Sequence, residues 1–202
     1  MREIFTQFFL AANWGSEESL SGTGSTMAAT EEIRRVIPLM LDHYDIQSIV
    51  DVPCGDMNWI ANTDLRGARY LGGDVVPELV YRNKRKYGDL ANVGFLTLDI
   101  TRDPLPSADL LLVRDLLGHF SDADITKALA NIMNSRSRYL LTTTFPAAKN
   151  DKDIETGKWR PINAEILLGA PPLEVIDEKV FDDNGKNVGK KLGLWDLEAL
   201  RK

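Results

Sequence analysis

Two aspartates flank a short turn whose one glycine would let a ligand approach the backbone closely. Asp51 ends an apolar, β-branched run, and Asp56 follows the turn directly after Gly55. Carboxylates repel a pyrophosphate, so the turn suits a ligand that presents an ammonium group and hydroxyl groups. A strand, a turn and a helix with incidental acids is the alternative that this stretch leaves open.

Further acids end other apolar runs along the chain. Asp74 follows Asp51 by roughly 20 residues, an interval at which an acid can accept hydrogen bonds from both ribose hydroxyls. The alternative for Asp74 is an N-cap of the next helix. Asp99 and Asp115 end two later runs. The two acids of the first turn, Asp51 and Asp56, suit S-adenosylmethionine, because it has a cationic amino-acid end, a sulfonium and a ribose diol.

The same turn argues against a dinucleotide cofactor. A pyrophosphate site needs the pattern Gly-x-Gly-x-x-Gly, and residues 51–56 contain one glycine. A nicotinamide-dependent oxidoreductase is therefore disfavoured. A protein that binds the cofactor without catalysing transfer would keep Asp51 and Asp74, so the sequence leaves that alternative open.

His119 is the best candidate for a general base, because it follows the fourth expected strand. Asp115 is close to it in sequence and could orient the imidazole or act as the base itself. A histidine at a helix entry that bonds to the backbone is the alternative for His119.

Trp14, Trp159 and Arg160 could shape an acceptor pocket, by stacking on a sugar face or holding an anionic group. Core packing is the alternative for both tryptophans.

Composition limits the function classes. The chain has 202 residues, 44% of them hydrophobic, and a formal net charge of −6. This balance disfavours a broad surface for nucleic acid or anionic membrane. Cys54 is the one cysteine, so we expect neither a disulfide framework nor a multi-cysteine metal site. No His, Cys and carboxylate cluster predicts a metal site. No signal peptide or bilayer-spanning run is recognisable, so a cytoplasmic location is expected.

The elements that must position these residues alternate between strands and helices. Apolar runs predict strands at 49–52, 69–74, 93–100, 108–115 and 138–145, and a returning pair at 173–181 and 191–196 around a turn at 183–186. Helical spacing predicts helices at 1–13, 26–44, 75–86 and 121–132, the last capped by Ser121, and one that starts near Asp56. We expect one domain, with residues 30–202 as its α/β core and residues 1–29 as a helix followed by a Gly/Ser-rich segment. That segment is either a linker or a lid over the site.

This pattern resembles the class I S-adenosylmethionine-dependent methyltransferases over about residues 30–200. The resemblance implies a Rossmann-like, doubly wound sheet of seven mostly parallel strands with a C-terminal antiparallel hairpin. The segments DVPCGD, GGDVVPELV, LTLDI, LLVRDLLGHFSD and YLLTTTF resemble a bacterial subgroup of largely uncharacterised members that often accompany glycan and capsule biosynthesis. NWGSEESLSGTGS and GKWRPIN fit the same subgroup.

The resemblance also implies roles for individual residues. The methionine end of the cofactor would lie in the first loop, which contains Asp51, Pro53, Cys54, Gly55 and Asp56. Asp74 would bind the ribose, and Asp99 and Ile100 would flank the adenine. Arg114 and Asp115 would line the floor of the methyl-transfer site.

The first loop departs from the family pattern of an acid followed by three alternating glycines. Pro53 replaces the first glycine and Met57 the third, so only Gly55 matches. The expected reaction is O-methylation of a small polar acceptor, such as a saccharide or a phosphorylated precursor. Neither the acceptor atom nor the oligomeric state follows from the sequence.

Overall fold

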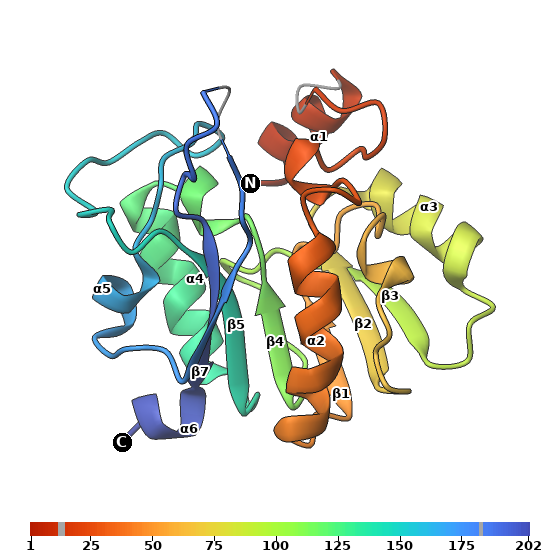
Figure 1. Cartoon of the computed structure of the whole chain (residues 1–202). Helices are drawn as coiled ribbons and strands as arrows, with labels where there is room; N and C mark the ends of the chain where they lie inside the picture. The colour runs from red at the N-terminus through yellow and green to blue at the C-terminus, as the bar shows by residue number, and fades with distance from the viewer. Residues whose placement is uncertain (12–14, 182–183) are drawn as a thin grey trace.

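The computed structural model describes residues 1–11, 15–181 and 184–202 of the chain. The described residues contain a seven-stranded sheet with the strand order β3-β2-β1-β4-β5-β7-β6 (Figure 1). The strands are β1 (Ser48–Asp51), β2 (Arg69–Asp74), β3 (Val93–Thr97), β4 (Leu110–Val113), β5 (Tyr139–Thr144), β6 (Glu174–Asp177) and β7 (Lys191–Asp196). The α-helices are α1 (Arg2–Leu10), α2 (Glu31–His43), α3 (Pro77–Tyr87), α4 (Asp122–Asn134), α5 (Ala164–Leu168) and α6 (Leu197–Leu200). Short 3-10 helices are η1 (Thr23–Ser25), η2 (Ile60–Asn62) and η3 (Leu117–His119).

The pairing of the strands confirms the fold predicted from the sequence. Strands β1 to β5 are mutually parallel where they pair, whereas β7 runs antiparallel to both β5 and β6. All four residues of β4 are buried, as expected for a central strand covered on both faces. The carboxyl ends of β1, β2, β3 and β4 therefore meet at one edge of the sheet, where ligands bind in open α/β folds.

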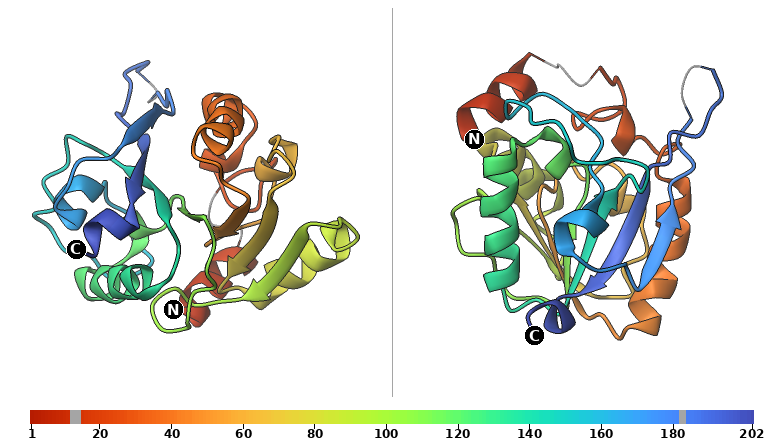
Figure 2. Two further views of the ribbon diagram at one scale, coloured as in Figure 1. Left: turned by 90° about the horizontal axis from the view of Figure 1, so that it is seen from below. Right: turned by 90° about the vertical axis from the view of Figure 1, so that its left-hand side faces the viewer.

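Two apolar layers hold the helices against the sheet. On one face, Ile33, Ile37 and Leu41 of α2 pack with the side chains that β1, β4 and β5 direct to that face. On the other face, Ile125 and Ile132 of α4 pack with the alternate residues of the same strands. The sheet consequently lies between α2 and α4, as the left-hand view of Figure 2 shows. Alternation of side chains along each strand is the reason that one strand can serve both layers.

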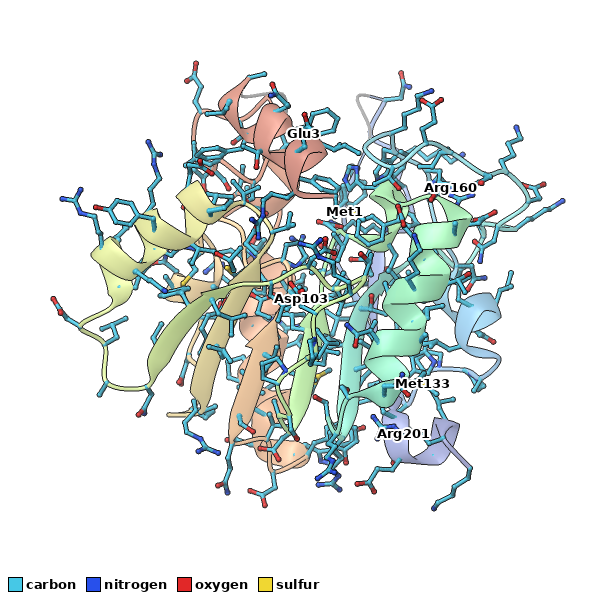
Figure 3. The ribbon with its side chains drawn as sticks, turned by 180° about the vertical axis from the view of Figure 1, so that it is seen from behind. Met1, Glu3, Asp103, Met133, Arg160 and Arg201 are labelled. Carbon is cyan, nitrogen blue, oxygen red and sulfur yellow. The ribbon has the colours of Figure 1, made fainter. Side chains whose placement is uncertain are left out.

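The N-terminal helix lies over the carboxyl ends of the strands rather than on a face of the sheet (Figure 1). Phe5, the buried residue of α1, contacts Phe120 at 6.1 Å between ring centroids. Met1 and Phe5 belong to the cavity described below, and Figure 3 shows Met1 above the ends of the central strands.

Several expected elements differ from those observed. No α-helix starts near Asp56, because Gly55 and Met57 have positive φ angles of 54° and 61°. The chain turns there instead and forms only η2. The strand expected at 173–181 ends at Asp177, and the expected turn at 183–186 falls partly outside the described residues. Helices α5 and α6 were not predicted, because five and four residues are too few to show helical periodicity.

Within the described part of the chain, no helix is long and apolar enough to cross a membrane.

Substitution of a central core residue should lower stability strongly. Leu111 of β4 is 0% exposed and contacts the layer beneath α4. Leu111→Ala should reduce the free energy of unfolding by about 2–5 kcal/mol, because it removes buried methyl groups and leaves a cavity. Urea denaturation followed by circular dichroism measures this. Leu173→Ala, at a leucine 54% exposed, is the control, and an equal loss in both variants would contradict the assignment of Leu111 to the core.

Candidate functional site

A cavity of about 490 Å³ lies at the carboxyl ends of the parallel strands. Residues that follow β1, β2, β3 and β4 line it, together with residues from α1, from the segment 21–25 and from the ends of β6 and β7. Its volume is within the range of pockets that enclose small ligands. The expected site residues that line it are Asp51, Pro53, Cys54, Gly55, Asp56, Asp74, Asp99, Ile100, Arg114, Asp115, His119 and Trp159.

Asp51 is held by a single short hydrogen bond from a neighbouring strand. The Tyr70 hydroxyl donates to Asp51 Oδ2 at 2.7 Å, and both residues are buried. Burial raises the pKa of Asp51 to about 7, although the Tyr70 hydrogen bond and the charge of Arg114 oppose the rise. A cationic ligand group beside this carboxylate would stabilise its ionised form.

The turn after β1 is held by hydrogen bonds to β2 and α3. Cys54 N donates to Gly73 O at 2.9 Å, and Asn83 Nδ2 of α3 donates to Gly55 O at 2.7 Å. The Cys54 thiol is buried, and burial raises its pKa well above the ordinary range. Cys54 is therefore a packing residue of the turn rather than a reactive thiol.

Asp74 lies directly beside this turn. Its Oδ2 accepts from Gly55 N at 3.1 Å and its Oδ1 accepts from Val76 N at 2.9 Å. Burial raises the pKa of Asp74 to about 6, against the lowering effect of these backbone hydrogen bonds. Val76, not Asp74, is the N-cap of α3. The carboxylate thus lines the cavity instead of capping the helix, which was the alternative.

Asp99 and Ile100 lie at the end of the third strand. Asp99 is buried and accepts from Thr101 Oγ1 at 2.6 Å and Thr101 N at 3.1 Å, through the same Oδ1. Its Oδ2 is 3.5 Å from Arg102 Nε. Ile100 is buried beside it and adds an apolar surface to the same part of the cavity.

Asp56 binds the segment 16–25, which we call the cap segment. Its carboxylate accepts from Ser19 Oγ at 3.0 Å, Leu20 N at 2.7 Å and Ser21 Oγ at 3.2 Å. In return, Asp56 N donates to Ser21 Oγ at 3.0 Å. The segment that the sequence left open as a linker or a lid is therefore docked on the cavity. Asp56 was expected to hold a ligand, but its carboxylate is engaged by the cap segment.

A second set of contacts holds both ends of the cap segment, at Glu18 and at Ser25. Glu18 Oε1 accepts from Asn58 Nδ2 at 2.7 Å and from Met27 N at 2.6 Å. Asn58 Nδ2 also donates to Ser25 O at 3.0 Å. Trp14, the expected aromatic anchor, lies outside the described residues.

Arg114 joins three segments that are far apart in sequence. Its Nη2 donates to Gly24 O of the cap segment at 2.8 Å and to Glu178 Oε2 beyond β6 at 2.5 Å. Its Nη1 lies 3.1 Å from Asp115 Oδ2, and its guanidinium lies over Trp59 at 5.5 Å from the ring centroid. Arg114 Nε and Glu178 Oε1 are buried and have no hydrogen-bond partner among the described residues.

Asp115 is paired with a lysine that sequence reasoning missed. Lys190 Nζ lies 2.6 Å from Asp115 Oδ2 and 3.2 Å from Glu178 Oε2, and Lys190 is only 7% exposed. Burial disfavours the ionised form of Asp115, but the charges of Arg114 and Lys190 outweigh it and lower the pKa to about 2. No short-range pattern links positions 115, 178 and 190, so only the folded chain brings them together.

His119 lines the cavity at the end of η3. Its Nδ1 is 3.1 Å from Lys158 O, and because a carbonyl only accepts, Nδ1 must carry the proton. The lone pair of the neutral ring is then on Nε2. Burial lowers the pKa of His119 below its ordinary value of 6.5. The ring is oriented by the Lys158 carbonyl and not by Asp115, so the hydrogen bond to the backbone that was the alternative for His119 is present.

Of the expected acceptor residues, Trp159 lines the cavity and Arg160 does not. Trp159 is 57% exposed, and its ring meets Phe145 edge to face at 5.8 Å between centroids. Arg160 is 8% exposed, and its Nη2 pairs with Asp122 Oδ1 at 2.5 Å and donates to Phe120 O. Figure 3 shows Arg160 beside the amino end of α4. The ligand role predicted for Arg160 gains no support from this arrangement, because the side chain lies outside the cavity lining and its charge is paired with Asp122.

Docking of the cap segment should depend on the glycine at position 55. A Cβ at Gly55 would lie 2.1 Å from Ser21 Oγ, so Gly55→Ala should displace the cap segment and raise amide hydrogen exchange over residues 19–25. Gly67→Ala is a matched control, since Gly67 also has a positive φ but has no atom within 4 Å of the added carbon. Equal exchange over residues 19–25 in both variants would show that Ser21 does not rest on Gly55.

Comparison with known proteins identifies the fold. No family model matches the chain, and no curated protein matches its sequence. Human N-acetylserotonin methyltransferase in complex with SAM is similar at 16% identity and a TM-score of 0.62, over 97% of this chain and 56% of that one. Magnesium protoporphyrin IX methyltransferase from Synechocystis with bound SAH is similar at 12% identity and a TM-score of 0.65, over 96% and 98%. N-methyltransferase NodS from Bradyrhizobium japonicum is similar at 14% identity and a TM-score of 0.60, over 83% and 96%. At these identities the likeness shows that the chain has the fold of S-adenosylmethionine-dependent methyltransferases.

Proposed function

We propose that the protein is an S-adenosylmethionine-dependent methyltransferase that acts on a hydroxyl group of a small acceptor. The observation that carries the proposal is the row of buried carboxylates, Asp51, Asp74 and Asp99, at the ends of the first three strands of a methyltransferase fold. Each is in the position where this fold presents polar groups to a nucleoside ligand.

The residues present fit this cofactor. Asp51 can accept from its ammonium group and Asp74 from its ribose hydroxyls, while Asp99 and Ile100 can accommodate the adenine. Arg114 Nε is a buried donor that lacks an acceptor, and a carboxylate at the methionine end would satisfy it. Pro53 and Gly55 of the turn line the same cavity, although two of the glycines usual in this loop are absent.

The chemistry then requires removal of one proton. When bound, S-adenosylmethionine supplies a methyl group on a cationic sulfur; its transfer to oxygen breaks the carbon–sulfur bond, leaves that electron pair on sulfur and releases the hydroxyl proton. His119 is suited to accept this proton through Nε2, because the Lys158 carbonyl fixes the protonated nitrogen at Nδ1. A pKa below 6.5 keeps the ring neutral at physiological pH.

Asp115 is a poor candidate for the base. With a pKa of about 2 and an ion pair to Lys190, its carboxylate has little affinity for a proton at neutral pH. We propose instead that Asp115 maintains the charge balance of the cavity floor. Thr143 Oγ1 supports this placement, because it accepts from Asp115 N at 2.9 Å and lies 3.3 Å from Asp115 Oδ1.

The chemical class of the acceptor must be inferred separately from the cofactor. The sequence suggested a saccharide or a phosphorylated precursor linked to glycan synthesis, with Trp159 as the stacking face. The similar structures do not fix the acceptor, because their names refer to N-acetylserotonin, magnesium protoporphyrin IX and N-methylation. A protein that binds the cofactor without turnover is the alternative, and formation of S-adenosylhomocysteine in the presence of an acceptor distinguishes the two.

Loss of the Asp74 carboxylate should weaken cofactor binding. Asp74→Ala should reduce the affinity for S-adenosylhomocysteine by about 1.5–3 kcal/mol, the scale of hydrogen bonds to a charged group. Calorimetry measures this, with Asp89→Ala at an exposed acid as the control. Because the pKa of Asp74 in the free protein is about 6, affinity should also fall as the pH drops below that value. Unchanged affinity in Asp74→Ala would remove the ribose assignment.

Loss of the His119 imidazole should affect turnover and not binding. His119→Asn should leave the cofactor affinity nearly intact and lower turnover on the order of a hundredfold. In the parent protein the rate should fall as the pH drops below the pKa of His119, which lies under 6.5, because protonation removes the Nε2 lone pair. Steady-state kinetics across pH test both effects. Full turnover in the variant, or methylation on nitrogen, would contradict the base role.

A further inference from the structure

The half of the cavity over β4, β5 and β7 differs chemically from the half over β1, β2 and β3. Carboxylates follow β1, β2 and β3, whereas Phe145 follows β5 and Val180 and Val188 belong to the hairpin between β6 and β7. If the cofactor occupies the carboxylate half, as proposed above, the acceptor must occupy the apolar half. The inference below therefore rests on the proposed function and adds the chemical class of the acceptor.

One wall of this half is aromatic and close to the proposed base. Phe145 and Trp159 meet edge to face, and Trp159 as a residue is 57% exposed. Trp159 also lies next to the chain of His119, because a Cβ at Gly118 would be 3.4 Å from Trp159 Nε1. Phe145, Trp159 and His119 all line the cavity, so a flat ring against the two aromatic side chains would share that cavity with the imidazole.

A second wall is aliphatic. Val188 N donates to Val180 O at 2.9 Å, and this contact holds the two valines together in the connection between β6 and β7. Both line the cavity, and Val188 is 42% exposed. Lys190 follows Val188 closely and connects this wall to Asp115 through its ion pair. The two walls offer apolar contact to a bound ring.

This half offers few polar groups to a ligand. His119 Nε2 has no partner among the described residues, whereas the carboxylate of Asp115 and the ammonium of Lys190 are already bonded to each other. A saccharide carries several hydroxyl groups, and each one buried without a partner costs free energy. An acceptor with one hydroxyl group directed to His119 leaves no such group unsatisfied.

The charges also disfavour a phosphorylated acceptor. Arg114 and Lys190 are the cationic side chains among the described residues that line the cavity, and Asp115 and Glu178 neutralise both. The carboxylates of the other half would repel a phosphate. His119 is, in addition, a weak base, so it removes a proton more readily from a phenolic hydroxyl, with a pKa of about 10, than from an alcohol.

We propose that the acceptor is an uncharged aromatic compound with a phenolic hydroxyl, held against the aromatic wall of Phe145 and Trp159 and the aliphatic wall of Val180 and Val188. The hydroxyl group points to His119 Nε2. This acceptor class replaces the saccharide and the phosphorylated precursor that the sequence suggested.

The test measures binding to the full chain saturated with S-adenosylhomocysteine. The probes are 4-methylphenol, catechol, methyl β-glucoside and glucose 6-phosphate, each followed by saturation-transfer NMR and calorimetry. The phenols should bind and the two sugars should not. Binding of either sugar with an affinity equal to or above that of the phenols would overturn the proposal, and so would the absence of phenol binding.

Variants locate the bound phenol. Trp159→Ala and Phe145→Ala should each weaken 4-methylphenol binding by about tenfold or more and change the affinity for S-adenosylhomocysteine by less than about twofold. Tyr81→Ala is the control, because Tyr81 is an aromatic residue 62% exposed on α3 and outside this cavity. Unchanged 4-methylphenol affinity in both cavity variants would contradict the aromatic wall.

The same experiments separate this inference from the proposed function. If S-adenosylhomocysteine does not bind the parent protein, the proposed cofactor is wrong. If it binds and phenols do not, only the acceptor class is wrong. Phenol binding that depends on Trp159 supports the acceptor class, and mass spectrometry after addition of labelled S-adenosylmethionine then shows whether the methyl group reaches the phenolic oxygen.

Discussion

The enclosure of the cavity depends on one buried guanidinium group. Arg114 extends from the end of β4 and binds the cap segment through Gly24 O, the hairpin through Glu178 and its own neighbour Asp115. Burying a charge is costly unless its partners are equally well placed, and here two carboxylates and a carbonyl contact the two terminal nitrogens of the guanidinium. Lys190 completes the cluster, so two cations and two anions balance within it. Removal of any one member would leave an uncompensated charge next to the ligand.

The strand order places the acidic and the apolar residues of the cavity on different halves of the sheet. The order β3-β2-β1-β4-β5-β7-β6 reverses direction between β1 and β4, which opens a crevice at their carboxyl ends. Acids after β1, β2 and β3 lie on one side of this crevice, and His119, Phe145 and the hairpin valines lie on the other. The N-terminal helix and the cap segment then cover it from above (Figure 1). In the proposed function, this topology would separate polar recognition of the cofactor from apolar recognition of the acceptor.

The sequence predicted what depends on local pattern and missed what depends on distant partners. The strands and their terminal acids could be predicted, because β-branched runs specify buried parallel strands and such strands end at a common edge. Asp56 and Arg160 have the residue types of ligand-binding groups, but their partners Ser21 and Asp122 are 35 and 38 positions away in the chain. Lys190 could not be identified at all, since nothing near it indicates Asp115, 75 positions earlier. Pairing of charges over such separations is set by the folded chain and leaves no periodic signal.

The contact between the cap segment and the first turn links two positions in evolution. Gly55 has a φ of 54°, and the space that a side chain would fill there contains the hydroxyl of Ser21. A lineage that acquires a side chain at the turn must therefore shorten or move the residue at position 21, and a lineage that keeps Ser21 must keep the glycine. The turn and the cap segment, although distant in sequence, should diverge among relatives as a single unit rather than as independent loops.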